Sequence, residues 1–100
     1  MARNRFEQVD EPQADALNLM LAKEDADKAL GRVLCPVSAA PARLPRGYDS
    51  GALPAVEAFR SAISLANTLE VAIVVIDPDG VWHKEWGDLF RDNEAAEAQT

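Results

Sequence analysis

An amphipathic helix followed at once by a buried strand is the pattern that most constrains the fold of this chain. Between Ala52 and Leu69, apolar residues recur at steps of three and four, the spacing that aligns side chains along one side of an α-helix. The next run, VAIVVI, is rich in β-branched residues and carries no charge, which is typical of a central strand covered on both faces. The helical stripe consists of Leu53, Val56, Phe59, Ile63, Ala66 and Leu69.

The N-terminal third of the chain favours another helix. Residues 1–12 are polar and include Pro12, so we expect a loose arm there. From Gln13 to Leu30 the composition is dominated by Ala, Leu, Met, Lys and Glu, which predicts a helix that ends at Gly31 in a left-handed cap. The competing interpretation is a strand, because apolar residues also alternate in this segment. The helical stripe would be Leu17, Met20 and Leu21, and the alternating one Leu17, Leu19 and Leu21.

A short strand and a long loop come next. The apolar segment Arg32–Val37 predicts a strand, and Pro36 places it at a sheet edge or ends it, because proline has no amide donor. Residues 38–49 contain two prolines and a glycine and are predicted to form a loop that is long enough to have a function.

This loop offers a candidate anion site just before the central helix. Pro54 fits the first helical turn, which needs no amide donor from it, and Ser50 or Asp49 could cap the helix. The helix dipole, the free amides of the first turn and two guanidinium groups would together attract a small anion. The candidate ligand-binding residues are Arg43, Arg46, Tyr48 and Ser50.

The segment Asp77-Pro78-Asp79-Gly80 has the chemistry of a tight turn. An aspartate at the first position can accept bonds from backbone amides, proline presets φ at the second, and glycine supplies a left-handed residue at the fourth. We therefore predict a hairpin that joins Val71–Asp77 to Val81–Trp86 through a three-residue loop.

The same segment resembles the first motif of the haloacid-dehalogenase-like phosphohydrolases, in which aliphatic residues precede Asp-x-Asp-x-Val. The resemblance implies a nucleophile at Asp77, a general acid or base at Asp79, and magnesium bound nearby. It covers about ten residues, and a motif counts only with its structural context. In that family a parallel sheet, a downstream lysine and a further pair of acids complete the site. Here the one lysine after Gly80, Lys84, lies inside the next predicted strand. The turn is the preferred interpretation.

The predicted hairpin has two unlike faces. We expect the central helix to cover the face with both tryptophans, because that face offers the larger apolar area. The opposite face is half apolar and half polar, and it is a candidate interface unless the N-terminal helix covers it. The first face carries Ala72, Val74, Ile76, Trp82 and Trp86. The candidate interface carries Val71, Ile73, Val75, His83 and Glu85.

These elements predict an α/β (α+β) fold, a two-layer sandwich with the order α-β-α-β-β. Its sheet would be small, mixed and three-stranded, with a C-terminal β-hairpin. A single domain would span residues 13–90, between the flexible arm of residues 1–12 and a flexible acidic tail of residues 91–100. The exposed edges of so small a sheet favour a homodimer.

Charge and composition exclude several function classes. The net charge of −7 argues against direct binding to a phosphate backbone, although acidic ends could mimic nucleic acid toward a basic partner. The sequence has one cysteine, Cys35, and one histidine, His83, with no supporting ligand pattern, so we expect no catalytic residues, no metal and no cofactor. No apolar run approaches the roughly 18 residues of a membrane span, and no secretory signal is present.

The sequence therefore predicts a small acidic cytoplasmic protein-binding module, acting as a regulator, inhibitor or adaptor without catalytic activity. The alternative is a small-anion-binding domain or simple enzyme that uses the Arg43/Arg46 loop and the following helix N-terminus.

Overall fold

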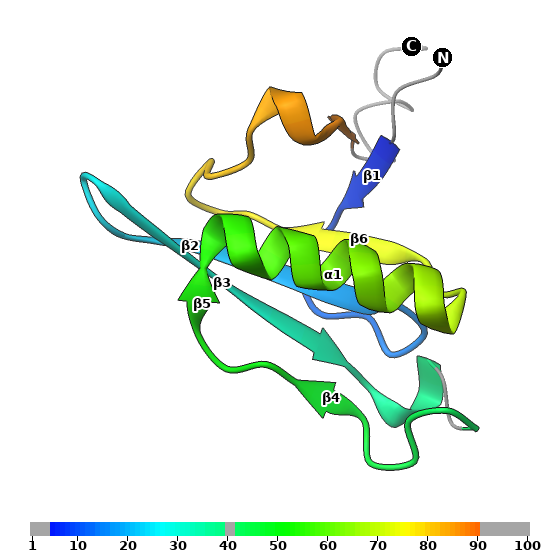
Figure 1. Cartoon of the computed structure of the whole chain (residues 1–100). Coiled ribbons are helices and arrows are strands. Elements are labelled where there is room, and N and C mark those ends of the chain that lie inside the picture. The colour runs from blue at the N-terminus through cyan, green and yellow to red at the C-terminus, as the bar shows by residue number, and fades with distance from the viewer. Residues whose placement is uncertain (1–4, 40–41, 91–100) are drawn as a thin grey trace, which may run out of the picture.

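The computed structural model describes residues 5–39 and 42–90. In these ranges, one α-helix packs on one face of a mixed sheet of seven strands (Figure 1). The mixed α+β class is therefore confirmed, but the sheet is larger than the expected three strands and the element order differs. The elements are β1 (Arg5–Gln8), β2 (Leu17–Asp25), β3 (Lys28–Cys35), the 3-10 helix η1 (Val37–Ala39), β4 (Tyr48–Asp49), β5 (Leu53–Pro54), α1 (Ala55–Leu69), β6 (Ile73–Ile76), the 3-10 helix η2 (Lys84–Trp86) and β7 (Asp88–Phe90).

The sheet has the strand order β4-β3-β2-β6-β1-β7, and β5 also pairs with β3. Strands β2, β6, β1 and β7 are parallel to one another. Strand β3 is antiparallel to β2, and the two short strands β4 and β5 are antiparallel to β3. Strand β6 therefore lies inside the sheet, as its uncharged β-branched sequence predicted.

The central helix is confirmed, but its predicted cap is wrong. Pro54 occupies the N-cap position, and neither Ser50 nor Asp49 bonds to the helix start. At the other end, Glu70 adopts a left-handed conformation with φ 57°, and its N–H donates to the carbonyl of Ala66. This bond satisfies one of the carbonyls that every helix end leaves open.

The predicted helix over residues 13–30 is wrong, and the competing strand is correct. Residues 17–25 and 28–35 form the antiparallel hairpin β2–β3, whose turn projects beyond the rest of the sheet (Figure 1). Leu17, Leu19 and Leu21 are at most 2% exposed. Burial of this alternating set outweighs the helical propensity of the Lys, Glu and Ala residues, which lie in the exposed outer half of the hairpin. Gly31 is accordingly a strand residue and no helix cap.

The turn at residues 77–80 forms, but the predicted hairpin after it does not. The Asp77 carboxylate accepts the N–H groups of Val81, at 2.7 Å, and Trp82, at 2.9 Å. These bonds turn the chain away from β6, and the sheet edge that the hairpin would have filled is occupied by β1. The C-terminal segment instead forms η2 and then β7, which pairs with β1 in parallel.

Strand β1 overturns the expectation of a loose arm for residues 5–8, because this strand pairs with β6 on one side and β7 on the other. The sequence did not indicate this strand, because it is short and contains polar residues such as Glu7 and Gln8. The expected domain limits stay predictions, and the acidic tail of residues 91–100 lies outside the described residues.

Helix α1 covers the face of the sheet opposite to the one predicted. Val75 is fully buried on the α1 side, in one cluster with Leu19, Val33 and the alanines of α1. Val74 and Ile76 therefore point to the face without a helix, because neighbouring residues of a strand alternate between faces. The two tryptophans separate from these residues and pack against Phe59 of α1.

Candidate functional site

The helix-free face of the sheet is organised in three rows of side chains. Residues paired across neighbouring strands project to the same face, so the strand register defines each row. The first row runs from β7 to β4 and contains Phe90, Glu7, Val74, Asn18, Leu34 and Asp49. The second contains Ile76, Met20 and Arg32, and the third Ala22, Leu30 and Pro54.

The connection from β1 to β2 covers part of the first row. Asn18 is 0% exposed, and its side chain is saturated by bonds to this connection and to β3. Its Oδ1 accepts the N–H of Gln13 at 2.7 Å. Its Nδ2 donates to the carbonyls of Gln13, Ala16 and Leu34 at 3.0–3.2 Å. These bonds hold the connection against the sheet and leave the second and third rows uncovered by it.

An apolar groove lies over the second and third rows. Its volume is about 480 Å³, within the usual range for ligand sites. Ile76 is 9% exposed, and Met20 and Leu30 are half-buried, so apolar atoms form the floor. The groove is lined by Met20, Leu21, Ala22, Leu30, Gly31, Arg32, Gly51, Ala52, Ile76 and Pro78.

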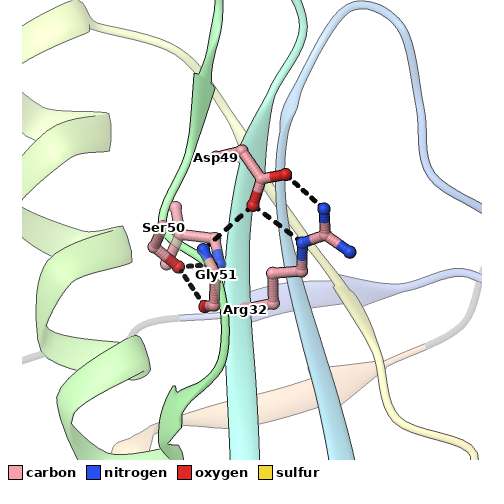
Figure 2. A network of polar contacts seen from close by, with 5 residues as sticks. Arg32, Asp49, Ser50 and Gly51 are labelled. Carbon is pink, nitrogen blue, oxygen red and sulfur yellow. Dashed lines mark hydrogen bonds and ion pairs between the residues drawn. The ribbon is translucent and has the colours of Figure 1, made fainter.

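A buttressed ion pair borders the groove on the β3–β4 side. Figure 2 shows the Arg32 guanidinium and the Asp49 carboxylate meeting edge to edge, joined by two dashed lines. Arg32 Nε donates to Asp49 Oδ1 at 2.7 Å, and Nη2 donates to Oδ2. The N–H of Gly51 also donates to Oδ1, at 3.0 Å. Ser50 Oγ accepts the N–H of Val33 at 2.9 Å and donates to the Gly51 carbonyl at 2.8 Å, which fixes the loop that carries Asp49.

These contacts change the acidity of both partners. The hydrogen bond from Arg32, with help from the Gly51 amide, lowers the pKa of Asp49 from 3.8 to about 2. The same hydrogen bond and the carboxylate charge raise the pKa of Arg32. At neutral pH the pair is therefore fully ionised and has no net charge, so this border of the groove is polar but neutral.

Acidic residues adjoin the groove next to Ala22, Leu30 and Pro78, and three of them, Asp25, Asp27 and Asp79, line a separate hollow of about 200 Å³. The β2–β3 turn and the turn after β6 meet there, and Asp79 Oδ2 accepts the N–H of Lys23 at 2.9 Å. Lys28 pairs with Glu24 at 3.3 Å. We call the four carboxylates beside the groove the acidic rim: Glu24, Asp25, Asp27 and Asp79. Against the two lysines they leave a net charge of −2 (four acids minus two bases).

The predicted anion site does not assemble. The Arg43 guanidinium donates to the carbonyl of Thr68 at the C-terminal end of α1, about 20 Å from the helix N-terminus for a helix of this length. Arg46 and Tyr48 are exposed, and Ser50 serves the loop described above. The four residues therefore do not converge on the helix start.

The predicted interface strip does not form either. Val75 is fully buried beneath α1, while Val71 and Ile73 pack at the margin of the core. His83 and Glu85 are exposed in the segment around η2, where His83 Nδ1 lies 3.7 Å from Glu85 Oε1. The strip depended on the hairpin that the structure lacks.

The two aspartates of the phosphohydrolase-like motif have structural partners. Both carboxylate oxygens of Asp77 accept backbone amides of its own turn, and Asp79 ties that turn to β2. Within the described ranges, no group of three His, Cys, Asp or Glu side chains could hold a metal ion. In the same ranges, no helix has the length and apolarity to cross a membrane.

Comparison of this chain with protein-family models, with curated proteins and with solved structures finds no match. Sequence reasoning missed the residues of the groove, and the alternation of Leu17, Leu19 and Leu21 is the signal that could have found them. Taken as a strand, it places Asn18, Met20 and Ala22 together on the opposite face.

Proposed function

We propose that this protein is a small acidic cytoplasmic module that binds another protein through the groove and acts without catalysis, as a regulator, inhibitor or adaptor. The observation that carries the proposal is an apolar hollow on the helix-free face of the sheet, bordered by polar groups. Contiguous apolar surface rimmed by polar residues is characteristic of interaction sites. A non-catalytic role is supported by Asp77 and Asp79, whose carboxylates bond to backbone amides.

Two features make the groove a suitable docking surface. Its floor consists of strand residues, whose backbone is held by the sheet, so binding would order few additional groups. Its polar border is already paired, because Arg32 and Asp49 satisfy each other. A partner's apolar side chains could therefore enter without leaving a buried charge unpaired, which is a condition for favourable burial.

The test is to fill the groove without disturbing the fold. Ala22 is exposed on β2 and lines the groove, so Ala22→Tyr would place a ring over the floor at a position that suits a strand residue. The matched control is Val56→Tyr on α1, where Val56 is 42% exposed. Wild type and the two variants are each used as bait in an extract of the cells that make the protein.

We expect a captured protein to bind wild type and Val56→Tyr equally and to bind Ala22→Tyr at least tenfold more weakly in a purified titration. Equal binding to all three baits would remove the groove from the proposal. Circular dichroism of each variant checks that the fold is retained.

A further inference from the structure

The charge around the groove points to the chemistry of its occupant. We infer that the groove takes an amphipathic segment with bulky apolar side chains and with Lys or Arg residues at the end that meets the acidic rim. The inference rests on the proposed function and narrows it to one class of partner.

The β3–β4 border of the groove and the acidic rim beside the groove differ in charge. The β3–β4 border is neutral, because Arg32 and Asp49 form a bidentate pair. The acidic rim keeps a net charge of −2 after its two lysines are counted. A partner with a uniform charge distribution would not match both borders, whereas a segment that is apolar along its length and basic at one end would.

The acidic rim follows closely on the residues that line the groove. Lys23 follows the groove residue Ala22, and Asp79 follows the groove residue Pro78. The remaining carboxylates of the acidic rim lie two or three residues from Ala22 or Leu30 along the hairpin. These separations are on the order of 3–10 Å, comparable with the Debye length of about 8 Å at physiological salt and well within the longer Debye length at low salt. A positive charge at this end of the groove would therefore be attracted.

A second copy of the chain is the alternative occupant of the groove. A second copy would bring another net charge of −7 and another acidic rim toward the first. Like charges facing each other oppose association. Charge complementarity therefore favours a basic partner over self-association through this face.

The experiment compares two synthetic peptides with the same central apolar sequence, Leu-Phe-Leu-Ile-Leu. One peptide carries three lysines at one end and the other carries three glutamates there. Each is labelled with fluorescein, and binding to the full chain is followed by fluorescence anisotropy at two salt concentrations. The variants are Ala22→Tyr, which fills the groove, and the double variant Asp27→Asn with Asp79→Asn. The double variant brings the net charge at this end from −2 to zero, and an asparagine oxygen at position 79 can still accept the Lys23 amide.

We expect the lysine peptide to bind at least tenfold more tightly than the glutamate peptide at low salt, and this ratio to shrink as salt is raised. Ala22→Tyr should lower the affinity for the lysine peptide at least tenfold. The double variant should lower the affinity for the lysine peptide at least threefold. It should leave the affinity for the glutamate peptide unchanged or raise it.

Other outcomes would overturn the inference. Equal binding of both peptides, with both lost in Ala22→Tyr, would show an apolar docking site without charge selection, and the proposed function would stand. If Ala22→Tyr leaves the affinity for the lysine peptide unchanged, the peptide does not bind in the groove and is held only by long-range charge attraction. If neither peptide binds, the inference fails, while the capture experiment still decides the proposed function independently.

The same samples distinguish the other occupants. A wild-type dimer in light scattering that becomes a monomer in Ala22→Tyr would assign the groove to a second copy. Saturable binding of dodecanoate by wild type, lost in Ala22→Tyr and without binding of either peptide, would assign it to a small amphiphile. Either result would overturn the inference.

Discussion

Asp49 shows how one exposed carboxylate can organise a border of the groove. It receives two hydrogen bonds from Arg32 and one from the Gly51 amide. Surface ion pairs contribute little in general, and bidentate geometry with a fixed backbone is the exception that gives them specificity. The loop that carries Asp49 is itself held by Ser50, which exchanges bonds with Val33 of β3.

Replacement of Asp49 by Asn should remove a pH-dependent part of the stability. The pKa of Asp49 is about 2 in the folded protein against an ordinary 3.8. Because the folded value is the lower one, the carboxylate stabilises the fold above about pH 4, and this contribution disappears as the pH falls through 2. We therefore expect the difference in free energy of unfolding between wild type and Asp49→Asn to be constant near neutral pH and to vanish toward pH 2.

The measurement is urea unfolding at several pH values between 2 and 7, because urea, unlike a guanidinium salt, does not screen charges. Asp15→Asn is the matched control, since Asp15 is also an exposed carboxylate. If Asp15→Asn and Asp49→Asn showed the same pH dependence, the lowered pKa would not be a property of the Arg32 pair.

At the scale of elements, the sequence shows α1 and β6 because their signals are local. A stripe of period 3.6 and an uncharged β-branched run each need only neighbouring residues for their recognition. In the first strand of the β2–β3 hairpin, a helix was preferred over the competing strand because Lys, Glu and Ala in its exposed half favour a helix, and only burial of Leu17, Leu19 and Leu21 decides the outcome.

Strands β1 and β7 depend on pairing between residues about 80 positions apart along the chain, as between Glu7 and Phe90, and short polar segments carry no signal of such a partner. The groove could not be predicted from the sequence for a related reason. Its position depends on which face of the sheet α1 covers. In the structure α1 covers the face that carries Val75, but the uncharged run around Val75 would be compatible with a helix on either face.

Gly31 sets the distance between α1 and the sheet. A Cβ atom at this position would lie 2.5 Å from the Cβ of Ala58 and 3.2 Å from Cδ2 of Leu21. We expect Gly31→Ala to lower the free energy of unfolding by about 2 kcal/mol through overpacking, although alanine normally suits a strand at least as well as glycine does. The measurement is urea unfolding followed by circular dichroism.

A double-mutant cycle identifies the cause. Ala58→Gly alone should cost about 1 kcal/mol, the helix penalty of glycine, but in the Gly31→Ala background it should cost less or restore stability, because it removes the atom that clashes. Additive effects of the two substitutions would contradict the close contact.

At the scale of the whole molecule, an aromatic cluster connects the ends of the described chain to its centre. Phe59 of α1 stacks on Trp86 with a centroid distance of 4.5 Å and meets Trp82 edge-on at 5.6 Å. Phe6 of β1 also contacts Phe59 and Trp82 edge-on. The segment around η2 is thus joined to both the helix and the sheet, and such aromatic pairs contribute about 0.5–1.5 kcal/mol each beyond the area they bury.

This connection predicts that the chain unfolds as one cooperative unit. Both tryptophans lie in the aromatic cluster, so their fluorescence reports the segment around η2, while far-ultraviolet circular dichroism reports the sheet and α1. We expect the two signals to give the same midpoint in urea for the wild type. In Phe59→Ala, which removes the half-buried ring between α1 and the tryptophans, the midpoint should fall. We expect the free energy of unfolding to drop by about 3 kcal/mol, the lower end for Phe→Ala, and the fluorescence transition to precede the dichroism transition. Two separate transitions already in the wild type would mean that the cluster does not couple this segment to the core, since local opening would then cost less than global unfolding.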